Sequence, residues 1–227
     1  GGCGMNQAPL QALYPFLHGK RQDAVKLDDA LAHSVSVKAA ESRAASEAFF
    51  AANTQALVGA AHALACMWRS GGRLLAMGNG GSSCDAAHVT VEFLHPITAG
   101  RPALATVNLG ADLAMLSAVG NDVGFDQVFA RQIEAHGRAG DAVIGFSTSG
   151  NSANLLEGFA TARRRGLVTL GFAGGDGGRM KSSGLVDHVL VAETQSVHRV
   201  QECHVAGYHI LWDLVHTLLA DARGATL

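Results

Sequence analysis

Apolar residues recur at helical spacing through a long segment near the N-terminus. Residues 27–68 are rich in Ala, contain no Pro and have few Gly, a composition that favours a continuous α-helix. One face of this helix carries apolar residues three or four positions apart, namely Leu57, Ala60, Ala61, Leu64 and Met67. The pattern therefore predicts a long N-terminal helix with one apolar face.

After residue 68, short apolar runs bounded by turn residues alternate with helical segments. The runs predicted to be strands are RLLAM (73–77), ALATV (103–107), AVIGFS (142–147), LVTLGF (167–172) and HVLVA (188–192). Helices are predicted at about 84–96, 111–119, 124–136, 152–165 and 197–221. Because strands that alternate with helices at this spacing form a parallel sheet covered on both faces, the sequence predicts an α/β fold. We find no internal repeat or low-complexity linker, so we expect one domain with long helical additions at its ends.

The composition is that of a globular protein with an ample core. Of the 227 residues, 48% are hydrophobic and 16% are charged, and the net charge of −2 gives no electrostatic case for nucleic acid or a charged membrane surface. The sequence shows neither an apolar span of membrane-crossing length nor a secretory signal, so we expect no membrane partner. The cysteines form no CxxC pair, which argues against a disulfide framework or a cysteine zinc site and favours a reducing cytoplasm; they are Cys3, Cys66, Cys84 and Cys203.

The first 28 residues stand apart from this pattern. GGCG before Met5 resembles a cloning remnant, and the mixed stretch 5–24 contains Pro9 and Pro15. We expect residues 1–28 to form an N-terminal arm, irregular or with a short helix, ahead of the domain.

Two predicted strands end in turns with matching chemistry. GNGGSS follows the strand at 73–77, and TSGNS follows the strand at 142–147. In parallel sheets, ligands bind beyond the carboxyl ends of the strands, and both turns offer backbone N–H groups and hydroxyls at the start of a helix. The alternative is that such turns merely cap helices, since Ser and Asn are good N-caps. Together the two turns favour a phosphate or a polyhydroxylated phosphate ester, and neither has the spacing of a nucleotide-binding loop.

His88 and Glu92 lie four residues apart and share one face of the helix after the first glycine turn. Such a pair holds a divalent metal, seats a general base next to a substrate carbon, or is only a surface ion pair. The last predicted helix carries Gln201, His204 and His209 at polar positions among apolar ones. Gln201 and His209 are separated by about 80° around the helix and roughly 12 Å along it. They join one metal only if their side chains reach toward each other, and otherwise serve neighbouring parts of a pocket.

These residues resemble the sugar isomerase (SIS) domain, and within it the phosphoheptose isomerase family. The resemblance rests on GNGGSSCDAAH followed by Glu92, then AVGNDVGFD (118–126), STSGNSANL (147–155) and RVQECH (199–204). It covers about residues 29–221 and implies a single SIS domain with a five-stranded parallel sheet flanked by helices. It further implies a homotetramer whose active sites form between subunits, with the long N-terminal helix packed in that assembly.

The resemblance also implies roles for individual residues. Glu92 and His209 match the family's acid–base pair, and zinc is bound in some members through positions that match His88, Glu92, Gln201 and His209. The residues implied to bind the sugar phosphate are Asn79, Gly80, Gly81, Ser82, Asn121, Asp122, Ser147, Thr148, Ser149, Ser152 and Gln201. Interconverting a ketose and an aldose moves a proton between adjacent carbons through an enediol, which a carboxylate such as Glu92 can carry. Since the unperturbed pKa of an imidazole is close to neutral, His209 can shuttle the oxygen-bound proton, and zinc would polarise the carbonyl. Because a glutamate bound to zinc is a weaker base, base and metal ligand are competing roles for Glu92.

The expected function is an isomerase that converts sedoheptulose 7-phosphate to D-glycero-D-manno-heptose 7-phosphate. One alternative is a non-catalytic SIS protein that binds a sugar phosphate or the bacterial replication initiator, and another is an SIS etherase or aminosugar isomerase. Two departures from the family bear on substrate choice. The segment after Glu92 reads FLHPITAGRPAL instead of a basic, Arg-containing segment, and His198 stands where an acidic residue is common.

Overall fold

The computed structural model describes residues 24–97 and 100–224 of the chain. The chain divides into two compact units, Gly1–Ala40 and Glu41–Leu227. In the first unit, residues 24–40 are helical, and their apolar side chains Leu31 and Val35 are exposed. The predicted arm before residue 24 lies outside the described residues, and the domain boundary at residue 29 stays a prediction.

The predicted long helix is confirmed as α3 (Ala24–Arg69). In its second half, the predicted apolar face is buried, with Leu57 and Leu64 at 3% and 0% exposure. One buried polar residue on this helix serves the sheet, because the Asn53 side chain accepts from the backbone N–H of Val191 and donates to its carbonyl. It therefore satisfies backbone groups of the last strand that no neighbouring strand pairs.

The predicted five-stranded parallel sheet is also confirmed. The strands are β1 (Leu74–Gly78), β2 (Thr106–Asn108), β3 (Ala142–Ser147), β4 (Val168–Gly174) and β5 (His188–Ala192). Their order is β2-β1-β3-β4-β5, with every neighbouring pair parallel. The chain direction across the sheet reverses between β1 and β3, and such a switch point opens a crevice at the carboxyl ends of these two strands.

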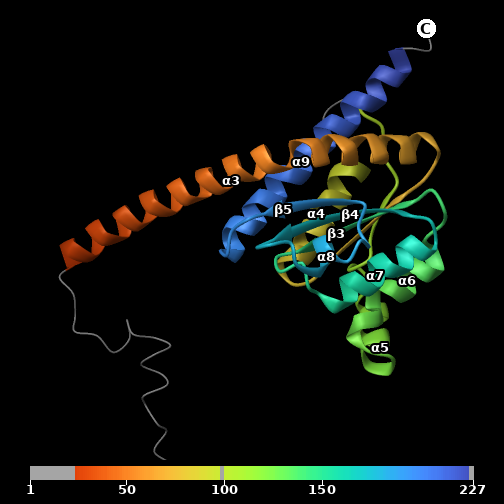
Figure 1. Ribbon diagram of the computed structural model, residues 1–227, viewed down its shortest axis with the longest axis horizontal. Coiled ribbons are helices and arrows are strands. Elements are labelled where there is room, and N and C mark those ends of the chain that lie inside the picture. The colour runs from red at the N-terminus through yellow and green to blue at the C-terminus, as the bar shows by residue number, and fades with distance from the viewer. Residues whose placement is uncertain (1–23, 98–99, 225–227) are drawn as a thin grey trace, which may run out of the picture. The chain divides into compact units, whose positions relative to one another are not determined.

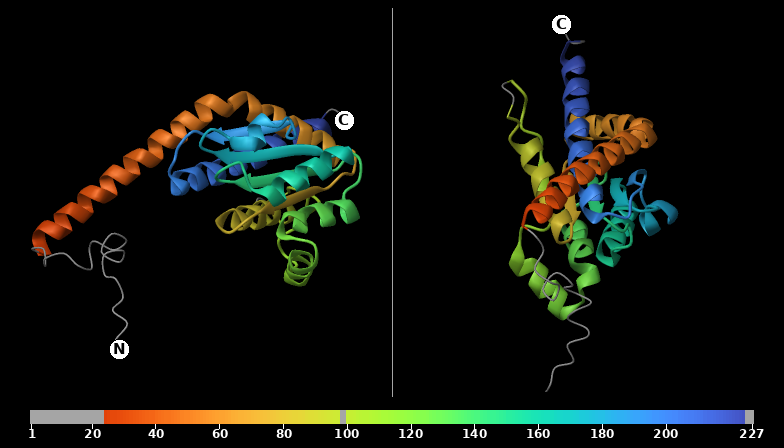
Figure 2. Two further views of the ribbon diagram at one scale, coloured as in Figure 1. Left: turned by 60° about the horizontal axis from the view of Figure 1, so that its bottom comes forward. Right: turned by 90° about the vertical axis from the view of Figure 1, so that its left-hand side faces the viewer.

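Alternating side chains of the strands build two separate cores. In β1, Leu74 and Ala76 belong to the core that also contains Phe49 and Phe93, whereas Leu75 and Met77 belong to the opposite one. The first core lies under α3, α4 (Gly81–Leu94) and α9 (Val197–Gly224). The second lies under the remaining helices, α5 (Leu113–Asp122), α6 (Val128–His136), α7 (Ala153–Arg164) and α8 (Gly178–Ser182). Figures 1 and 2 show these layers on the two faces of the sheet.

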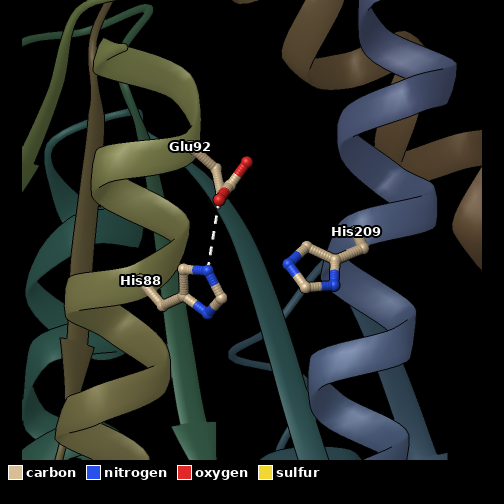
Figure 3. Close-up of side chains that lie close together, drawn as sticks. All are labelled: His88, Glu92 and His209. Atoms are coloured by element: carbon tan, nitrogen blue, oxygen red, sulfur yellow. Dashed lines mark hydrogen bonds and ion pairs between the residues drawn. The ribbon is translucent and has the colours of Figure 1, made fainter. Parts of the chain in front are cut away.

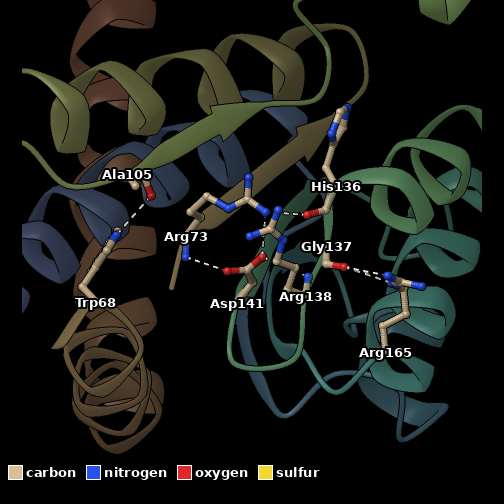
Figure 4. Close-up of polar contacts among 8 residues, drawn as sticks. All are labelled: Trp68, Arg73, Ala105, His136, Gly137, Arg138, Asp141 and Arg165. Carbon is tan, nitrogen blue, oxygen red and sulfur yellow. Dashed lines mark hydrogen bonds and ion pairs between the residues drawn. The ribbon is translucent and has the colours of Figure 1, made fainter. Parts of the chain in front are cut away.

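A buried carboxylate joins the amino-terminal ends of β1 and β3, at the end of the sheet opposite the crevice. Asp141 precedes β3, is 4% exposed, and accepts from the backbone N–H groups of Arg73 and Arg138 at 2.8 and 3.0 Å. The Arg73 guanidinium lies 3.2 Å from the same carboxylate (Figure 4). Since Arg73 precedes β1, this contact sets the starts of β1 and β3 side by side and leaves their carboxyl ends for the site.

Several helix ends differ from the prediction by a few residues, as at α4 (predicted at 84–96) and α5 (predicted at 111–119). Two differences are larger. The predicted helix at 124–136 is split into a 3-10 turn, η1 (Phe125–Gln127), and α6. Helix α8 was not predicted, because its glycine-rich start carries no helical signal and Gly177 and Gly178 both have positive φ. Among the described residues, none of the helices combines the length and apolar character needed to cross a membrane.

Candidate active site

The first glycine turn joins β1 to α4 in a backbone conformation that requires glycine. Gly80 has φ 53° and ψ −124°, which a residue with a side chain rarely adopts. The next residue, Gly81, leaves room for a neighbouring side chain, because an added Cβ would lie 2.2 Å from the Gln201 amide nitrogen. The Gln201 side chain thus lies directly over the start of α4, and it links α9 to the glycine turn. Ser82 follows in the first turn of α4 and is buried.

The second turn, after β3, presents a row of hydroxyls. Ser147 and Ser152 are hydrogen-bonded through their side-chain oxygens at 2.9 Å. Between them, Ser149 accepts from the backbone N–H of Asn151 at 3.2 Å. With Thr148, these are the hydroxyl residues that the sequence predicts to hold a phosphate, and the structure brings them together at one end of the sheet.

A reciprocal amide pair joins the two turns. The Asn79 and Asn154 side chains each donate to the other at 2.8 Å. Asn154 lies in the first turn of α7 and is only 3% exposed. Sequence reasoning missed Asn154, although an amide among the apolar positions Leu155, Leu156 and Phe159 of a helix was a usable signal. The pair ties the glycine turn after β1 to the hydroxyl turn after β3.

A cavity of about 430 Å³ lies beside the hydroxyl turn. Thr148 and Ser149 line it on one side, and Val197 and Val200 line it from the first turns of α9. The loops after β4 and β5 supply the rest of the wall, including Asp176, Thr194 and Gln195. The lining holds no Lys or Arg side chain, so an anion bound here would depend on hydroxyls and backbone N–H groups.

The predicted acid–base pair and the first metal ligand form a compact cluster between α4 and α9 (Figure 3). One ligand atom from each of His88, Glu92 and His209 lies within 4.8 Å of the others. His88 Nε2 is 3.1 Å from Glu92 Oε1, and the His88 and His209 rings meet at 5.0 Å between centroids. Two imidazole nitrogens and a carboxylate oxygen are a donor set that suits a divalent metal with one open position. The geometry therefore fits a metal site.

Two aromatic residues of α9 support this cluster, and neither was predicted. The Tyr208 hydroxyl is hydrogen-bonded to His88 Nδ1 at 2.7 Å, and the Tyr208 side chain is almost fully buried. Burial, together with the nearby charges of Asp85 and Glu92, raises the pKa of Tyr208, so its phenol stays neutral. The Trp212 indole N–H donates to the Glu92 carbonyl at 2.8 Å and fixes the backbone of α4 at that residue.

Asp85 is a buried acid one turn before His88 on α4. Its side chain is 6% exposed, and its Oδ2 atom has no hydrogen-bond partner among the described residues. Burial raises the pKa of Asp85 to about 6, although the nearby His88 opposes that shift. Sequence reasoning did not single out this residue, because an aspartate beside a helix start is commonly an exposed capping group.

His204 is one of the three polar residues that the sequence singles out on the last helix. In the structure its side chain is buried and is not part of the cluster. It is 0% exposed, and its Nε2 donates to the Ala173 carbonyl of β4 at 3.2 Å. Burial lowers the pKa of His204 to about 4, so the ring is neutral at physiological pH. Its hydrogen bond links α9 to the sheet.

Asn121 and Asp122 are the predicted substrate residues that the structure does not bring to the site. They lie at the end of α5, exposed to solvent, and Asn121 donates to Asp122 at 2.7 Å. In Figures 1 and 2, α5 lies apart from α9, the helix that carries His209. Within one chain, these two residues are therefore separate from the rest of the candidate site.

Comparison with known proteins places this site in a family. The SIS domain model matches residues 39–174. Phosphoheptose isomerase from Chlorobaculum tepidum is 44% identical over 169 residues, covering 74% of this chain and 80% of that protein. The one from Thermodesulfovibrio yellowstonii is 36% identical over 185 residues, covering 82% of this chain and 91% of that protein.

Solved structures agree with this match. The structure of phosphoheptose isomerase from Neisseria gonorrhoeae aligns with a TM-score of 0.77 at 36% identity, covering 82% of this chain and 99% of that one. A phosphoheptose isomerase from Francisella tularensis aligns with a TM-score of 0.78 at 29% identity, covering 82% and 97%. The chain therefore belongs to the phosphoheptose isomerase family of SIS-domain proteins.

Proposed function

We propose that this protein is an isomerase that interconverts sedoheptulose 7-phosphate and D-glycero-D-manno-heptose 7-phosphate. The observation that carries the proposal is the cluster of His88, Glu92 and His209, whose ligand atoms lie within 4.8 Å of one another between α4 and α9. Helix α9 also borders the hydroxyl-lined cavity, through Val197 and Val200. A non-catalytic SIS protein would need only the phosphate turns, so a clustered acid, base and metal donor set favours the enzyme. The names of the relatives agree with this reading.

The two catalytic residues divide the proton transfers between them. Glu92 carries the proton between the two adjacent carbons, because a carboxylate can accept and return a proton and the Glu92 side chain is still 25% exposed. His209 shuttles the proton between the two substrate oxygens, since an imidazole both donates and accepts near neutral pH. Trp212 supports this chemistry by holding the Glu92 backbone.

We propose zinc as the metal of this site, with His88, Glu92 and His209 as ligands. When bound, the zinc ion would polarise the substrate carbonyl. The family resemblance implies two roles for Gln201, substrate binding and a fourth metal ligand, and its position over Gly81 supports substrate binding. Loss of metal from a His88→Gln variant but not from Gln201→Ala would separate these roles.

The sugar phosphate is proposed to lie along α9, from the hydroxyl turn to the cluster. Ser147, Thr148, Ser149 and Ser152 would hold the phosphate, and the glycine turn of Gly80, Gly81 and Ser82 would bind the sugar through backbone N–H groups. The Asn79 side chain is hydrogen-bonded to Asn154, and this bond would hold Asn79 in place to contact the sugar. The distance along α9 from Val200 to His209 is about 13 Å, which suits a substrate whose reacting carbons lie far from its phosphate.

We further propose a homotetramer in the cytoplasm with sites shared between subunits. Asn121 and Asp122 lie apart from the site of their own chain, and large apolar side chains around them are exposed, with Leu113 at 78%, Val123 at 60% and Phe125 at 59%. An exposed apolar group beside predicted substrate residues favours contact with a second copy.

The proposed location in the cytoplasm has a separate basis. The free thiols of Cys66, Cys84 and Cys203 support a reducing compartment.

One experiment tests the activity directly. The protein is incubated with ketose 7-, 6- and 5-phosphates, and aldose formation is followed with and without a metal chelator. We expect turnover of sedoheptulose 7-phosphate that the chelator abolishes and zinc restores. Binding of the sugar phosphate with no aldose formed in the zinc-loaded protein would instead support a non-catalytic sugar-phosphate sensor.

A further inference from the structure

The buried hydroxyl of Tyr208 has no part in the proton transfers described above. It lies 2.7 Å from His88 Nδ1, on the side of the ring opposite to the nitrogen that faces Glu92. The Tyr208 ring also packs edge-on against the rings of His88 and His209, at 5.5 and 4.8 Å between centroids. Tyr208 thus contacts both histidines of the cluster.

The partners of the His88 ring define its tautomer. His88 Nε2 lies 3.1 Å from Glu92 Oε1, and an ionised carboxylate only accepts hydrogen bonds. In the metal-free protein, a neutral His88 therefore carries its hydrogen on Nε2, and Nδ1 accepts from the Tyr208 hydroxyl. When Nε2 gives its lone pair to a metal, the hydrogen of the neutral ring must be on Nδ1, which then donates.

A hydroxyl is suited to both states, because it can donate and accept. A backbone carbonyl or carboxylate in the same place would accept only, and would fix one tautomer permanently. The ring stays neutral in the exchange, because the Nε2 proton passes to solvent as the metal binds and Nδ1 takes one proton from solvent, which reaches the 44% exposed side chain. The Tyr208 hydrogen then turns toward another acceptor, and Asp85, which interacts electrostatically with both Tyr208 and His88, has a buried oxygen without a partner among the described groups.

We propose that Tyr208 is a positioning residue of the metal site, whose hydroxyl holds the His88 ring and reverses its hydrogen-bonding role when His88 binds the metal through Nε2. This inference rests on the metal site of the proposed function. It predicts that removing the Tyr208 hydroxyl, which is not a metal ligand, weakens the metal affinity of the substrate-free protein.

Zinc affinity, measured by competition with a chromophoric chelator, gives the first test. Tyr208→Phe keeps the ring and its packing but lacks the hydroxyl, and we expect zinc to bind about 10- to 100-fold more weakly. Thr90→Val is the matched control, because it removes a buried hydroxyl from α4 that bonds only the Ala86 carbonyl in the structure. The control should bind zinc within about twofold of the native affinity. Equal affinities of Tyr208→Phe and native protein would overturn the inference.

The second test observes the tautomer itself. Nitrogen-15 spectra of the imidazoles, with the His88 signals identified by their loss in His88→Gln, report which ring nitrogen carries the hydrogen. We expect Nε2–H without metal and Nδ1–H with zinc; a single tautomer in both states would refute the reversal. If His88→Gln binds zinc as well as native protein does, the metal site itself is wrong. If His88→Gln loses zinc and Tyr208→Phe does not, only the role of Tyr208 fails.

Discussion

At the scale of single residues, the proposed site gives Glu92 two competing roles, general base and metal ligand. Glu92→Gln keeps the shape of the side chain but cannot accept a proton. We expect turnover to fall by about 10² to 10⁴ while substrate still binds. Exchange of the substrate's carbon-bound hydrogen with deuterated solvent, measured at full metal occupancy, should vanish in the variant. Exchange at the native rate would leave His209 as the better candidate for the base, and recovery of activity in excess zinc would make Glu92 mainly a ligand.

His204 gives a residue-scale prediction about stability. Burial lowers its pKa to about 4 from the ordinary 6.5, so below pH 6.5 the unfolded chain binds a proton that the folded protein resists. The stabilisation from keeping His204 neutral is therefore complete above pH 6.5 and is lost as the pH falls toward 4. Between pH 7.5 and 5, the loss is about 2 kcal/mol.

Urea unfolding of native protein and His204→Gln at these two pH values checks the prediction. Glutamine can still donate to the Ala173 carbonyl but does not titrate. Asp85 acts in the opposite direction, because its raised pKa of about 6 makes the folded protein lose stability as the pH rises from 3.8 to 6. Comparing native protein with the variant at each pH cancels the contribution of Asp85. An identical pH dependence of the two proteins would show that His204 protonates as easily folded as unfolded.

At the scale of elements, the predicted strands were accurate where apolar runs end abruptly in turns. Strands β3 and β5 begin and end where the sequence predicts, whereas β2 is shorter, because only Thr106–Asn108 pairs with β1. The glycine and hydroxyl turns were also visible, since a helix start after a strand has a local signature. The long-range contacts within the candidate site were not predictable from the sequence. Asn79 and Asn154 are 75 positions apart, and His88 and Tyr208 are 120 apart. Only the folded sheet brings such pairs together.

The connection from β1 to α4 offers a prediction in which two glycines, Gly78 at the end of β1 and Gly81 at the start of α4, behave differently. A Cβ on Gly81 would meet the movable end of Gln201, whereas a Cβ on Gly78 would lie 2.2 Å from the Ser82 backbone oxygen. We expect Gly81→Ala to fold with nearly native stability but to displace Gln201 and weaken sugar-phosphate binding by about tenfold. Gly78→Ala should lose about 1–3 kcal/mol of stability, because backbone cannot yield as a side chain does. Urea unfolding and calorimetric titration measure the two effects, and native substrate affinity in Gly81→Ala would remove Gln201 from the site.

At the scale of the whole molecule, the fold was predictable from alternating strands and helices, but the complete site was not. The sequence places Asn121 and Asp122 in the same family motif set as Glu92, yet the fold puts them at the end of α5, apart from α9, which carries His209. Nothing in the pattern of one chain tells which residues meet across a subunit boundary. The exposed apolar side chains of Leu113 on α5 and Phe125 on η1 are the surface that the proposed contact with a second copy would cover.

Mixed oligomers test whether that partner is a second copy of the chain. Asp122→Ala and Glu92→Gln are each expected to be inactive alone, since each damages every site. If a site takes Glu92 from one subunit and Asp122 from another, dissociating and reassembling an equal mixture should restore about a quarter of the native activity, because both positions are native in that fraction of sites. The matched control mixes Glu92→Gln with His209→Gln. These two residues share a site within one chain, so that mixture should stay inactive. Restoration in both mixtures would reflect subunit effects other than site sharing, and a fully active monomer in light scattering would contradict the shared site altogether.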